Sequence, residues 1–297
     1  MKKNVVCFGE VLWDVLPTGK LAGGAPMNVA IRLQSLGIDA AVISKIGSDN
    51  NGTELLSIIE NANVNTSLIQ NGSIATGTVQ VTLDAKGNAS YEIVYPSAWD
   101  KIEFSEAQLS VLKNADAFVY GSLATRDEVS RNTLNSLIEA SKWNVFDVNL
   151  RAPFYNIDSI LQMMQRANFV KLNDDELVLI TSAIGGEGLS IEEQANLLAK
   201  HTNVKSICVT KGANGAILLS NNKIYSHPGY KVIVQDTIGA GDSFLATLLA
   251  ELLNNASPEN ALDKACAMGA LVASKAGANA IVSEEELASI LKTKAPL

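Results

Sequence analysis

Histidine and cysteine are scarce in this chain of 297 residues, with two and three copies respectively. Two histidines cannot supply a site with three histidine ligands, and neither stands beside a motif, so a His-based catalytic triad is not expected either. The cysteines are odd in number, lie far apart, and each sits in an apolar stretch: Cys7, Cys208 and Cys266. We therefore expect buried free thiols, as in a reducing compartment, and no disulfide framework.

Positive charge is also in short supply, because 23 Lys and Arg stand against 31 Asp and Glu, giving a net charge of -8. This balance is not that of a protein that binds duplex nucleic acid or an anionic membrane, so an anionic ligand must be held by local groups. Long hydrophobic runs are missing as well. The run at 5–8 is too short for a signal peptide, and the run at 244–253 contains Glu251 and falls short of the ~20 residues of a membrane span. The sequence predicts a soluble, cytoplasmic protein without nucleic-acid or membrane partners.

The chain does have a high apolar content, 47% against 18% charged residues, which excludes a disordered protein. β-Branched runs are found at 5–8, 41–46, 117–120, 145–148, 169–172, 207–210 and 216–219. They alternate with helical patterns at 28–36, 53–60, 127–141 and 191–200. Apolar strands that alternate with helices predict a mostly parallel sheet covered on both faces. Consecutive helices are expected in the last third, at 243–253, 258–276 and 284–292.

One segment departs from this rhythm, since apolar and polar residues alternate over 76–84 and again over 91–95, after a turn at 86–88. The alternation predicts a hairpin with one apolar face. Together with an extended piece after the first strand, it forms a candidate lid or dimer surface from about 11–22 and 74–98. A hairpin at the sheet edge without such a role is the alternative. No repeat or flexible linker is found, so we expect one domain with a lid.

The sharpest motif is DTIGAGD at 236–242, followed directly by apolar residues at helical spacing. Gly239 and Gly241 have no side chains that would cover the backbone at the start of that helix. The exposed N–H groups there carry positive partial charge and bind anions such as phosphate. No GxxxxGK[ST] loop occurs, so the turn is not of the Walker type. Asp242 lies beside this anion site and suits a base that takes a proton from an attacking hydroxyl. The alternative is that Asp242 only caps the helix.

These seven residues resemble the signature of the pfkB (ribokinase-like) carbohydrate kinase family, and further stretches resemble that family in the same order from near residue 4 to near residue 282. The resemblance implies a three-layer α/β/α sandwich with a mostly parallel central sheet and a small β-sheet lid. It also implies transfer of the γ-phosphoryl group of ATP to a sugar hydroxyl, with Mg²⁺ as a cofactor. The resemblance further implies that Asp242 is the catalytic base. It also implies that the turn of Gly239, Ala240 and Gly241 stabilises the phosphoryl group during its transfer.

The first half of the chain carries the stretches that the family uses for the sugar. GGAPMNVA at 23–30 resembles its N-terminal glycine signature, in the form typical of fructokinases. Two glycines before a helix let the backbone approach a ligand closely. The side chain of Asn28 can both donate and accept hydrogen bonds, as a sugar hydroxyl requires. Taken alone, the same residues are compatible with ordinary turns. The implied sugar-binding residues are Asp14, Gly23, Gly24, Asn28, Gly47, Arg151 and Asp242.

Later strand ends carry the remaining motifs. DVNLR at 147–151 resembles the family's Asp-Xaa-Asn-Xaa-Arg motif. The planar guanidinium group of Arg151 suits phosphate or sugar oxygens at the carboxyl end of a parallel strand. A salt bridge between Arg151 and Asp147 is the alternative. KLNDDE at 171–176 resembles Asn-Xaa-Xaa-Glu, in which Glu176 holds Mg²⁺ through water, and a capping box is also expected there. Asp236, with the loop at 277–280, is implied to hold K⁺. The implied ATP-binding residues are Lys171, Asn173, Thr210, Lys211, Gly212, Gly215, Gly239, Gly241 and Asn279.

The choice of sugar follows from the forms of these motifs, which look most like fructokinases. Fructokinases, however, commonly have Arg and Asp where this chain has Tyr95 and Trp99, so 2-keto-3-deoxygluconate, ribose and nucleosides stay open. A binding protein that lost activity is disfavoured because Asp242 and the glycine turn are intact. A Rossmann dehydrogenase is disfavoured because no GxGxxG follows the first strand. A homodimer through the lid is a further expectation.

Overall fold

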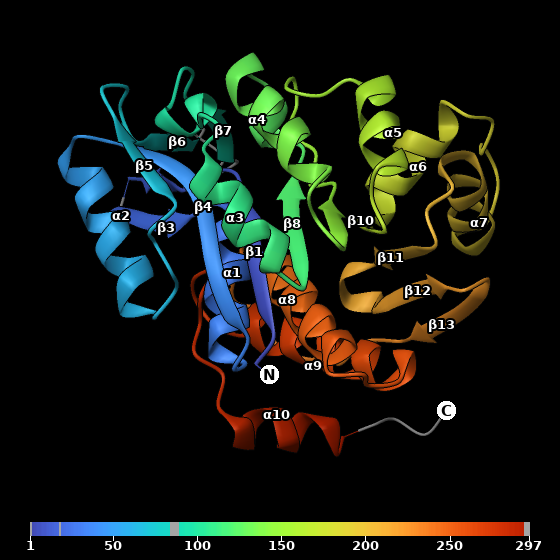
Figure 1. The fold of residues 1–297 in the computed structure, drawn as a ribbon. Helices are drawn as coiled ribbons and strands as arrows, with labels where there is room; N and C mark the ends of the chain where they lie inside the picture. The colour runs from blue at the N-terminus through green and yellow to red at the C-terminus, as the bar shows by residue number, and fades with distance from the viewer. Residues whose placement is uncertain (1, 18, 84–88, 294–297) are drawn as a thin grey trace. The chain divides into compact units, whose positions relative to one another are not determined.

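A computed structural model describes residues 2–17, 19–83 and 89–293 of the protein (Figure 1). The chain divides into two compact units, residues 1–142 and 143–297. Strands alternate with helices in both, so the predicted α/β class is confirmed. The hairpin turn predicted at 86–88 lies outside the described residues.

The larger sheet of the first unit is parallel. Its central strand β1 (Asn4–Phe8) pairs with β4 (Asp39–Gly47) on one side and with β8 (Ala117–Gly121) on the other, and β4 pairs with β5 (Ile69–Gly72). The strands predicted at 5–8, 41–46 and 117–120 are thereby confirmed, and their side chains are almost entirely buried. The helices of this unit are α1 (Ala25–Ser35), α2 (Asn50–Asn61), α3 (Glu106–Asn114) and α4 (Glu128–Ile138).

A second, smaller sheet of the first unit has the strand order β3-β2-β6-β7. Its strands are β2 (Leu12–Leu16), β3 (Gly19–Gly23), β6 (Gly77–Leu83) and β7 (Ala89–Ile93). The β6–β7 pair is antiparallel and confirms the predicted hairpin. In β6, Val79 and Val81 are buried while Gln80 and Thr82 are exposed, as the alternation predicts. The register places Asp14 opposite Leu21 and Val79, so an acidic residue stands in a row with apolar ones.

The sheet of the second unit has three parallel strands, β9 (Asn144–Asp147), β10 (Phe169–Asn173) and β11 (Ser206–Thr210). An antiparallel hairpin, β12 (Ala216–Ser220) and β13 (Lys223–His227), extends it beyond β11. The helices are α5 (Ile157–Gln165), α6 (Asp174–Ser182), α7 (Ile191–Thr202), α8 (Ala240–Leu253), α9 (Pro258–Ala273) and α10 (Glu284–Leu291). The last three are the consecutive helices that the sequence predicts, and α8 and α9 lie side by side (Figure 1).

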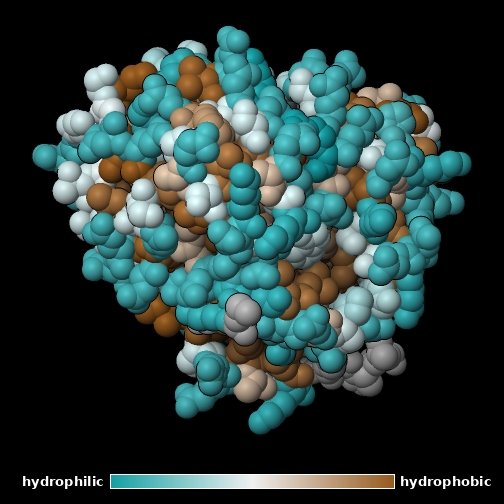
Figure 2. Space-filling view, in the orientation of Figure 1, coloured by the Kyte–Doolittle hydropathy of each residue, from teal (hydrophilic) through white to brown (hydrophobic). Residues whose placement is uncertain are grey.

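The three cysteines are free and buried, as predicted. Burial raises the pKa of each thiol, that of Cys266 to about 12, so all three stay protonated near neutral pH. Hydrophilic side chains cover most of the face in Figure 2, with smaller hydrophobic areas between them. Within the described ranges, none of the helices has both the length and the apolar content that crossing a membrane requires.

Candidate active site

The DTIGAGD motif forms a left-handed turn that begins α8. Gly239 is the N-cap residue, with φ 73°, a conformation that favours glycine. A Cβ on this residue would also lie 2.3 Å from the carbonyl oxygen of Ala278, so the position excludes larger residues for two reasons. The helix starts at Ala240, and Asp242 is therefore the third residue of the first turn rather than its cap. Because first-turn N–H groups lack carbonyl partners within their helix, this turn presents amides and positive partial charge.

Lys171 lies next to this turn, since a Cβ on Gly241 would be 3.4 Å from its Nζ. The Nζ donates a hydrogen bond of 2.9 Å to Oδ1 of Asp147, and both side chains are buried. Burial alone would lower the pKa of Lys171, but the carboxylates of Asp147, Asp242 and Glu176 outweigh it and raise that pKa. A charged ammonium group therefore stands beside the start of α8.

Glu176 and Asn173 form the predicted capping box at the start of α6. The Asn173 side chain accepts from the Glu176 N–H at 2.8 Å, and Oε2 of Glu176 accepts from the Asn173 N–H at 2.9 Å. Oε1 accepts from the Leu150 N–H at 2.7 Å, which ties the loop after β9 to α6. Burial raises the pKa of Glu176, and the backbone hydrogen bonds and the charge of Lys171 offset this only in part.

The possible metal ligands around Glu176 suit a hydrated divalent cation better than a cation that is coordinated by protein side chains alone. In the part of the chain that is described, no three His, Cys, Asp or Glu side chains form a group that could hold a metal ion. Both oxygens of Glu176 already accept backbone hydrogen bonds, so its remaining acceptor capacity suits a water molecule. Mg²⁺ keeps several waters and is usually bound by phosphates with one or two carboxylates. Glu176 thus fits the water-mediated role that the sequence predicts.

Asp236 joins two loops of the second unit. Its Oδ1 accepts from the Ile238 N–H at 3.0 Å, and its Oδ2 accepts from the Gly277 N–H at 3.1 Å. The observed role of Asp236 is therefore to connect the DTIGAGD turn with the loop at 277–280. Asn279 belongs to the same loop, directly after Ala278. Binding of K⁺ by these groups stays a prediction.

The predicted nucleotide-binding turn follows β11, which ends at Thr210. The Lys211 N–H donates to the Gly215 carbonyl at 2.7 Å and closes a turn around the short helix η3 (Gly212–Asn214). Gly215 has φ 78°, and a Cβ there would lie 2.0 Å from the His227 carbonyl oxygen, so only glycine fits. The end of β13 therefore supports this turn from behind.

Arg151 is a predicted site residue of this unit that lies in the open, as do Asn173 and Gly212. Its side chain is exposed, and its Nη1 donates to the neighbouring Leu150 carbonyl at 3.0 Å. The alternative expectation of a salt bridge to Asp147 is wrong, because Asp147 is buried and pairs with Lys171 instead. The guanidinium group is left for contact with a ligand or with solvent.

In the first unit the predicted sugar residues surround the start of α1 and the ends of β1 and β4. Gly24 is the N-cap of α1, with φ 116°, and a Cβ there would lie 2.3 Å from the Glu10 carbonyl oxygen. A Cβ on Gly23 would lie 2.7 Å from Oδ2 of Asp14, so backbone and carboxylate are in contact here. Asn28 is buried in the first turns of α1.

Gly47 lies at the other side of this region, at the end of β4. Its N–H donates to the Thr76 hydroxyl at 2.9 Å, and a Cβ on it would meet the Ile74 carbonyl oxygen at 2.7 Å. Asp49 accepts hydrogen bonds from Thr76 and from Gly52, which fixes the start of α2. The crowded backbone explains why glycine stands at this position.

The comparisons with known proteins bear on these motifs directly. The model of the pfkB family carbohydrate kinases matches residues 2–285. The chain belongs to this family. It is 31% identical, over 98% of its length, to probable fructokinase-4 of Arabidopsis thaliana, 97% of which is covered. It is 30% identical, over 97% of its length, to a fructokinase of Solanum tuberosum, 95% of which is covered.

Solved structures of similar fold cover nearly all of the kinase. A fructokinase of Vibrio cholerae O395, solved with fructose, ADP and calcium ion, is 26% identical, with TM-score 0.83 over 97% of this chain and 99% of that one. A putative ribokinase II of E. coli has TM-score 0.86 and 20% identity over 99% and 100% of the two chains. These likenesses confirm the predicted ribokinase-like fold.

The kinase departs from the fructokinase pattern at a buried cluster of the first unit. Trp99 is fully buried, and the Arg126 guanidinium lies 4.1 Å from the centre of its ring. Arg126 donates to both carboxylate oxygens of Asp100, at 2.7 and 2.8 Å, and to the Val94 carbonyl at 2.7 Å. Asp100 therefore cannot replace the carboxylate that fructokinases commonly carry one position earlier. The Tyr95 hydroxyl, the other departure, donates to Asp127 at 2.9 Å.

Glu10 is a buried polar residue of the kinase to which the sequence assigned no role in the site. It is 3% exposed, and its Oε1 accepts from the Ala25 N–H, at the first residue of α1, at 3.3 Å. The signal for it was an acidic residue inside an otherwise apolar stretch, two positions after β1. Its contact helps to hold the glycine turn before α1.

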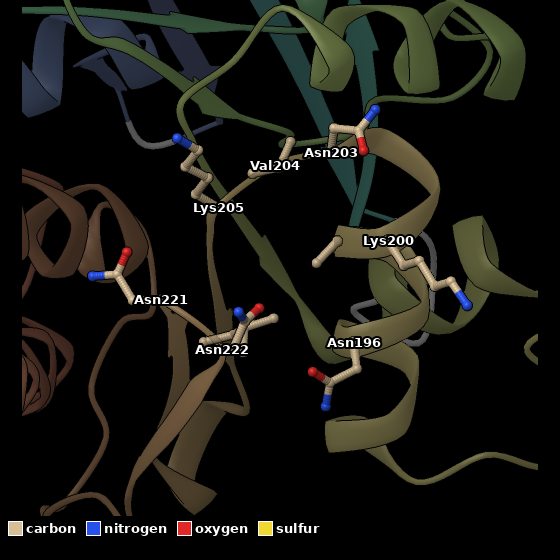
Figure 3. A pocket seen from close by; sticks show the side chains of 9 residues that line it. Asn196, Lys200, Asn203, Val204, Lys205, Asn221 and Asn222 are labelled. Atoms are coloured by element: carbon tan, nitrogen blue, oxygen red, sulfur yellow. The ribbon is translucent and has the colours of Figure 1, made fainter.

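A pocket of about 660 Å³ in the second unit is not the predicted site (Figure 3). It adjoins the end of α7, the start of β11 and the turn between β12 and β13. None of the predicted site residues lines it. In this unit Arg151 follows the carboxyl end of β9, and Asn173 and Thr210 end β10 and β11, whereas the pocket lies at the amino end of β11. In Figure 3 the amino group of Lys200 points away from Asn221 and Asn222, so charge does not converge there.

Proposed function

We propose that the protein is an ATP-dependent fructokinase, which transfers the γ-phosphoryl group of ATP to a hydroxyl group of fructose. The observation that carries the proposal is the start of α8, where the Gly239–Gly241 turn, the Asp242 carboxylate and the Lys171 ammonium group occur together. The plant relatives named fructokinase and the Vibrio cholerae fructokinase solved with fructose and ADP support the choice of substrates.

The proposed reaction uses the second unit for phosphoryl transfer. Asp242 takes the proton of the attacking hydroxyl, whose oxygen forms a bond to the γ-phosphorus while the bond to the bridging oxygen of ADP breaks. The amides of the glycine turn and the ammonium group of Lys171 stabilise the charge that develops on the γ-phosphoryl oxygens. The positive end of α8 favours the carboxylate form that a base requires. Mg²⁺, when bound to the phosphates, would supply further charge neutralisation, with Glu176 holding one of its waters.

Binding roles are assigned to the remaining motif residues. The residues proposed for the sugar are Asp14, Gly23, Gly24, Asn28, Gly47, Arg151 and Asp242. Those proposed for ATP are Lys171, Asn173, Thr210, Lys211, Gly212, Gly215, Gly239, Gly241 and Asn279. K⁺ is assigned to Asp236 and the loop at 277–280.

We propose a single kinase domain whose lid, formed from about residues 11–22 and 74–98, closes over the sugar and excludes water. The same lid is the proposed surface of a homodimer. A cytoplasmic location is proposed on the three buried free thiols, which suit a reducing compartment.

A second candidate is another kinase of the same family, acting on 2-keto-3-deoxygluconate, ribose or a nucleoside. The cluster around Trp99 favours keeping this candidate. Its ring is buried, and the next carboxylate along the chain, Asp100, is engaged by Arg126 and by the Ser97 N–H. The carboxylate that fructokinases commonly use at this place therefore has no substitute within the cluster.

A coupled assay of ADP release with Mg²⁺ and ATP tests the proposal across ketoses, aldoses, keto-deoxy acids and nucleosides. We expect fructose to give the highest kcat/KM in this panel. A higher value with another acceptor would replace fructose by that acceptor and keep the kinase. ADP release no faster than the sugar-free blank with every acceptor would overturn the kinase proposal itself.

A further inference from the structure

Asp147 has a contact pattern that a purely structural carboxylate would not need. It ends β9 and is the direct register partner of Lys171 in β10. The two side chains are 4% and 10% exposed, and Oδ1 accepts the hydrogen bond of 2.9 Å from Nζ. The other oxygen, Oδ2, is buried and finds no hydrogen-bond partner among the described residues. Buried carboxylates kept for stability usually have both oxygens satisfied, so this one is retained at a cost.

The charges around Lys171 are unequal in number. Three carboxylates, those of Asp147, Glu176 and Asp242, act on one ammonium group. Asp147 accepts a hydrogen bond from it, while Glu176 has its oxygens on backbone N–H groups. The position of the ammonium group is therefore decided by Asp147. Without the charge of Asp147, the hydrogen bond that keeps Nζ of Lys171 beside the Gly239–Gly241 turn would be weaker.

We propose that Asp147 is a positioning residue that holds the ammonium group of Lys171 beside the Gly239–Gly241 turn. The inference rests on the proposed phosphoryl-transfer function and adds to it a residue that touches neither sugar nor nucleotide. Asp147 acts through Lys171, because its hydrogen bond keeps the cation where the γ-phosphoryl group is stabilised.

A double-mutant cycle on kcat tests this inference, with the variants D147N, K171M and D147N/K171M measured at saturating sugar. We expect D147N to lower kcat by about 10- to 100-fold, the effect of one hydrogen bond to a charged group. In the K171M background the same substitution should change kcat by less than about 3-fold, because a residue that acts through a missing partner has nothing left to position. Equal effects of D147N in both backgrounds would overturn the inference.

Nucleotide binding without sugar provides a readout that does not depend on turnover. Calorimetry with ADP and with a non-hydrolysable ATP analogue should show that D147N loses about 10-fold in affinity for the analogue and little for ADP, since Lys171 is placed at the γ-phosphoryl position. A merely structural role would weaken both ligands equally, and that result would count against the inference.

Two controls separate the possible failures. T181V removes a buried hydroxyl that donates to Gln194 at 2.9 Å in the same unit, and it should leave kcat and both affinities unchanged. If D147N does not fold, a loss of more than about 3-fold from K171M to D147N/K171M would still overturn the inference, and D147E, which keeps the charge, supplies the single-variant leg of the cycle. An inactive wild-type protein would defeat the proposed function, whereas an active wild-type protein with an additive cycle would defeat only the role of Asp147.

Discussion

Each unit contains a buried ion pair, and the two pairs are built differently. In the first unit, Arg126 and Asp100 are 2% and 0% exposed and share two parallel hydrogen bonds. The same guanidinium also donates to the Val94 carbonyl and lies over the Trp99 ring. In the second unit, Lys171 and Asp147 share one hydrogen bond, and one oxygen of Asp147 has no partner among the described residues.

The difference indicates which pair serves the fold and which serves the reaction. A bidentate Arg–carboxylate pair with its other donors satisfied fixes one geometry and has little capacity for a ligand. In the second unit one lysine faces three carboxylates, so the charges of the cluster are not balanced. Burial of such a cluster is unfavourable unless a bound ligand interacts with its charged groups. We therefore assign the pair of the first unit to stability and the cluster of the second unit to chemistry.

The largest expected effect is that of D242N on turnover. Replacing the proposed base by an amide of the same size should lower kcat by about 10²- to 10⁴-fold while ADP still binds. The measurement is steady-state ADP release together with calorimetric binding of ADP. The free energy of unfolding should change by less than about 1 kcal/mol, because Asp242 is not the cap of α8. A variant with normal turnover would remove Asp242 from the role of base.

The second effect concerns stability and sets the two ion pairs against each other. D100N leaves the buried Arg126 without its carboxylate, which should reduce the free energy of unfolding by about 3–5 kcal/mol. D147N should reduce it by less than about 1.5 kcal/mol, because Lys171 keeps the charges of Asp242 and Glu176 nearby. Urea unfolding of both variants measures the difference. Equal losses in the two variants would show that both pairs are structural and would end the comparison.

The third effect tests the glycine turn at the start of α8. G239A places a Cβ where the Ala278 carbonyl stands 2.3 Å away, at φ 73°, so we expect a loss of about 2 kcal/mol or more in stability and weaker ADP binding. Gly185 is the matched control, since it has φ 85° but nothing within 4 Å of an added Cβ. G185A should cost only the conformational strain, about 1 kcal/mol, and leave ADP binding unchanged. Similar ADP affinities in both variants would mean that contact with Ala278 does not shape the turn.

The smallest effect concerns a fully satisfied carboxylate of the first unit. Burial alone would raise the pKa of Asp49, but hydrogen bonds from Thr76 and Gly52, with the charge of Lys20, lower it below its ordinary 3.8. A carboxyl group with a lowered pKa stabilises the fold above its unfolded pKa and loses that contribution as pH falls through the folded pKa. Wild type should exceed D49N in free energy of unfolding by about 0.3–1 kcal/mol at pH 7, the usual contribution of a negative charge at a helix N-terminus, because Asn can still cap α2.

The matching measurement is chemical unfolding of wild type and D49N between pH 7 and pH 3. The difference between the two proteins should shrink only below about pH 4, since the shift moves the titration to lower pH. A difference that stays constant down to pH 3 would contradict the assignment of this contribution to the charged carboxylate.

Much of the fold could be predicted because its signals are local. The apolar runs became β1, β4 and β8 in one unit and β9 to β12 in the other, and the Asn173–Glu176 spacing gave the capping box. Strand β13, which ends at His227, was not predicted. Strand β13 is half-exposed and lacks an apolar run, so its formation depends on pairing with β12. The turn between the two strands contains Asn221 and Asn222, whose backbone is in the left-handed conformation.

The details of the site that sequence did not predict depend on contacts between distant residues. Asp242 looked like a possible cap because Asp is a good capping residue. The helix begins earlier instead, because Gly239 takes a left-handed conformation at the N-cap, and the contact with the distant Ala278 carbonyl favours glycine at this position. A salt bridge of Asp147 with Arg151, four residues away, was the alternative reading of the DVNLR motif, but the register of β9 and β10 places Lys171 directly opposite Asp147.

The link between Asp236 and Gly277 spans 41 positions of the chain, and the Gln235 N–H is held by the Ala273 carbonyl, at the end of α9. The turn at 236–242 is therefore held in shape by residues near 273 and 277, which come later in the chain. Substitutions at these later positions would alter the turn as directly as substitutions within DTIGAGD itself.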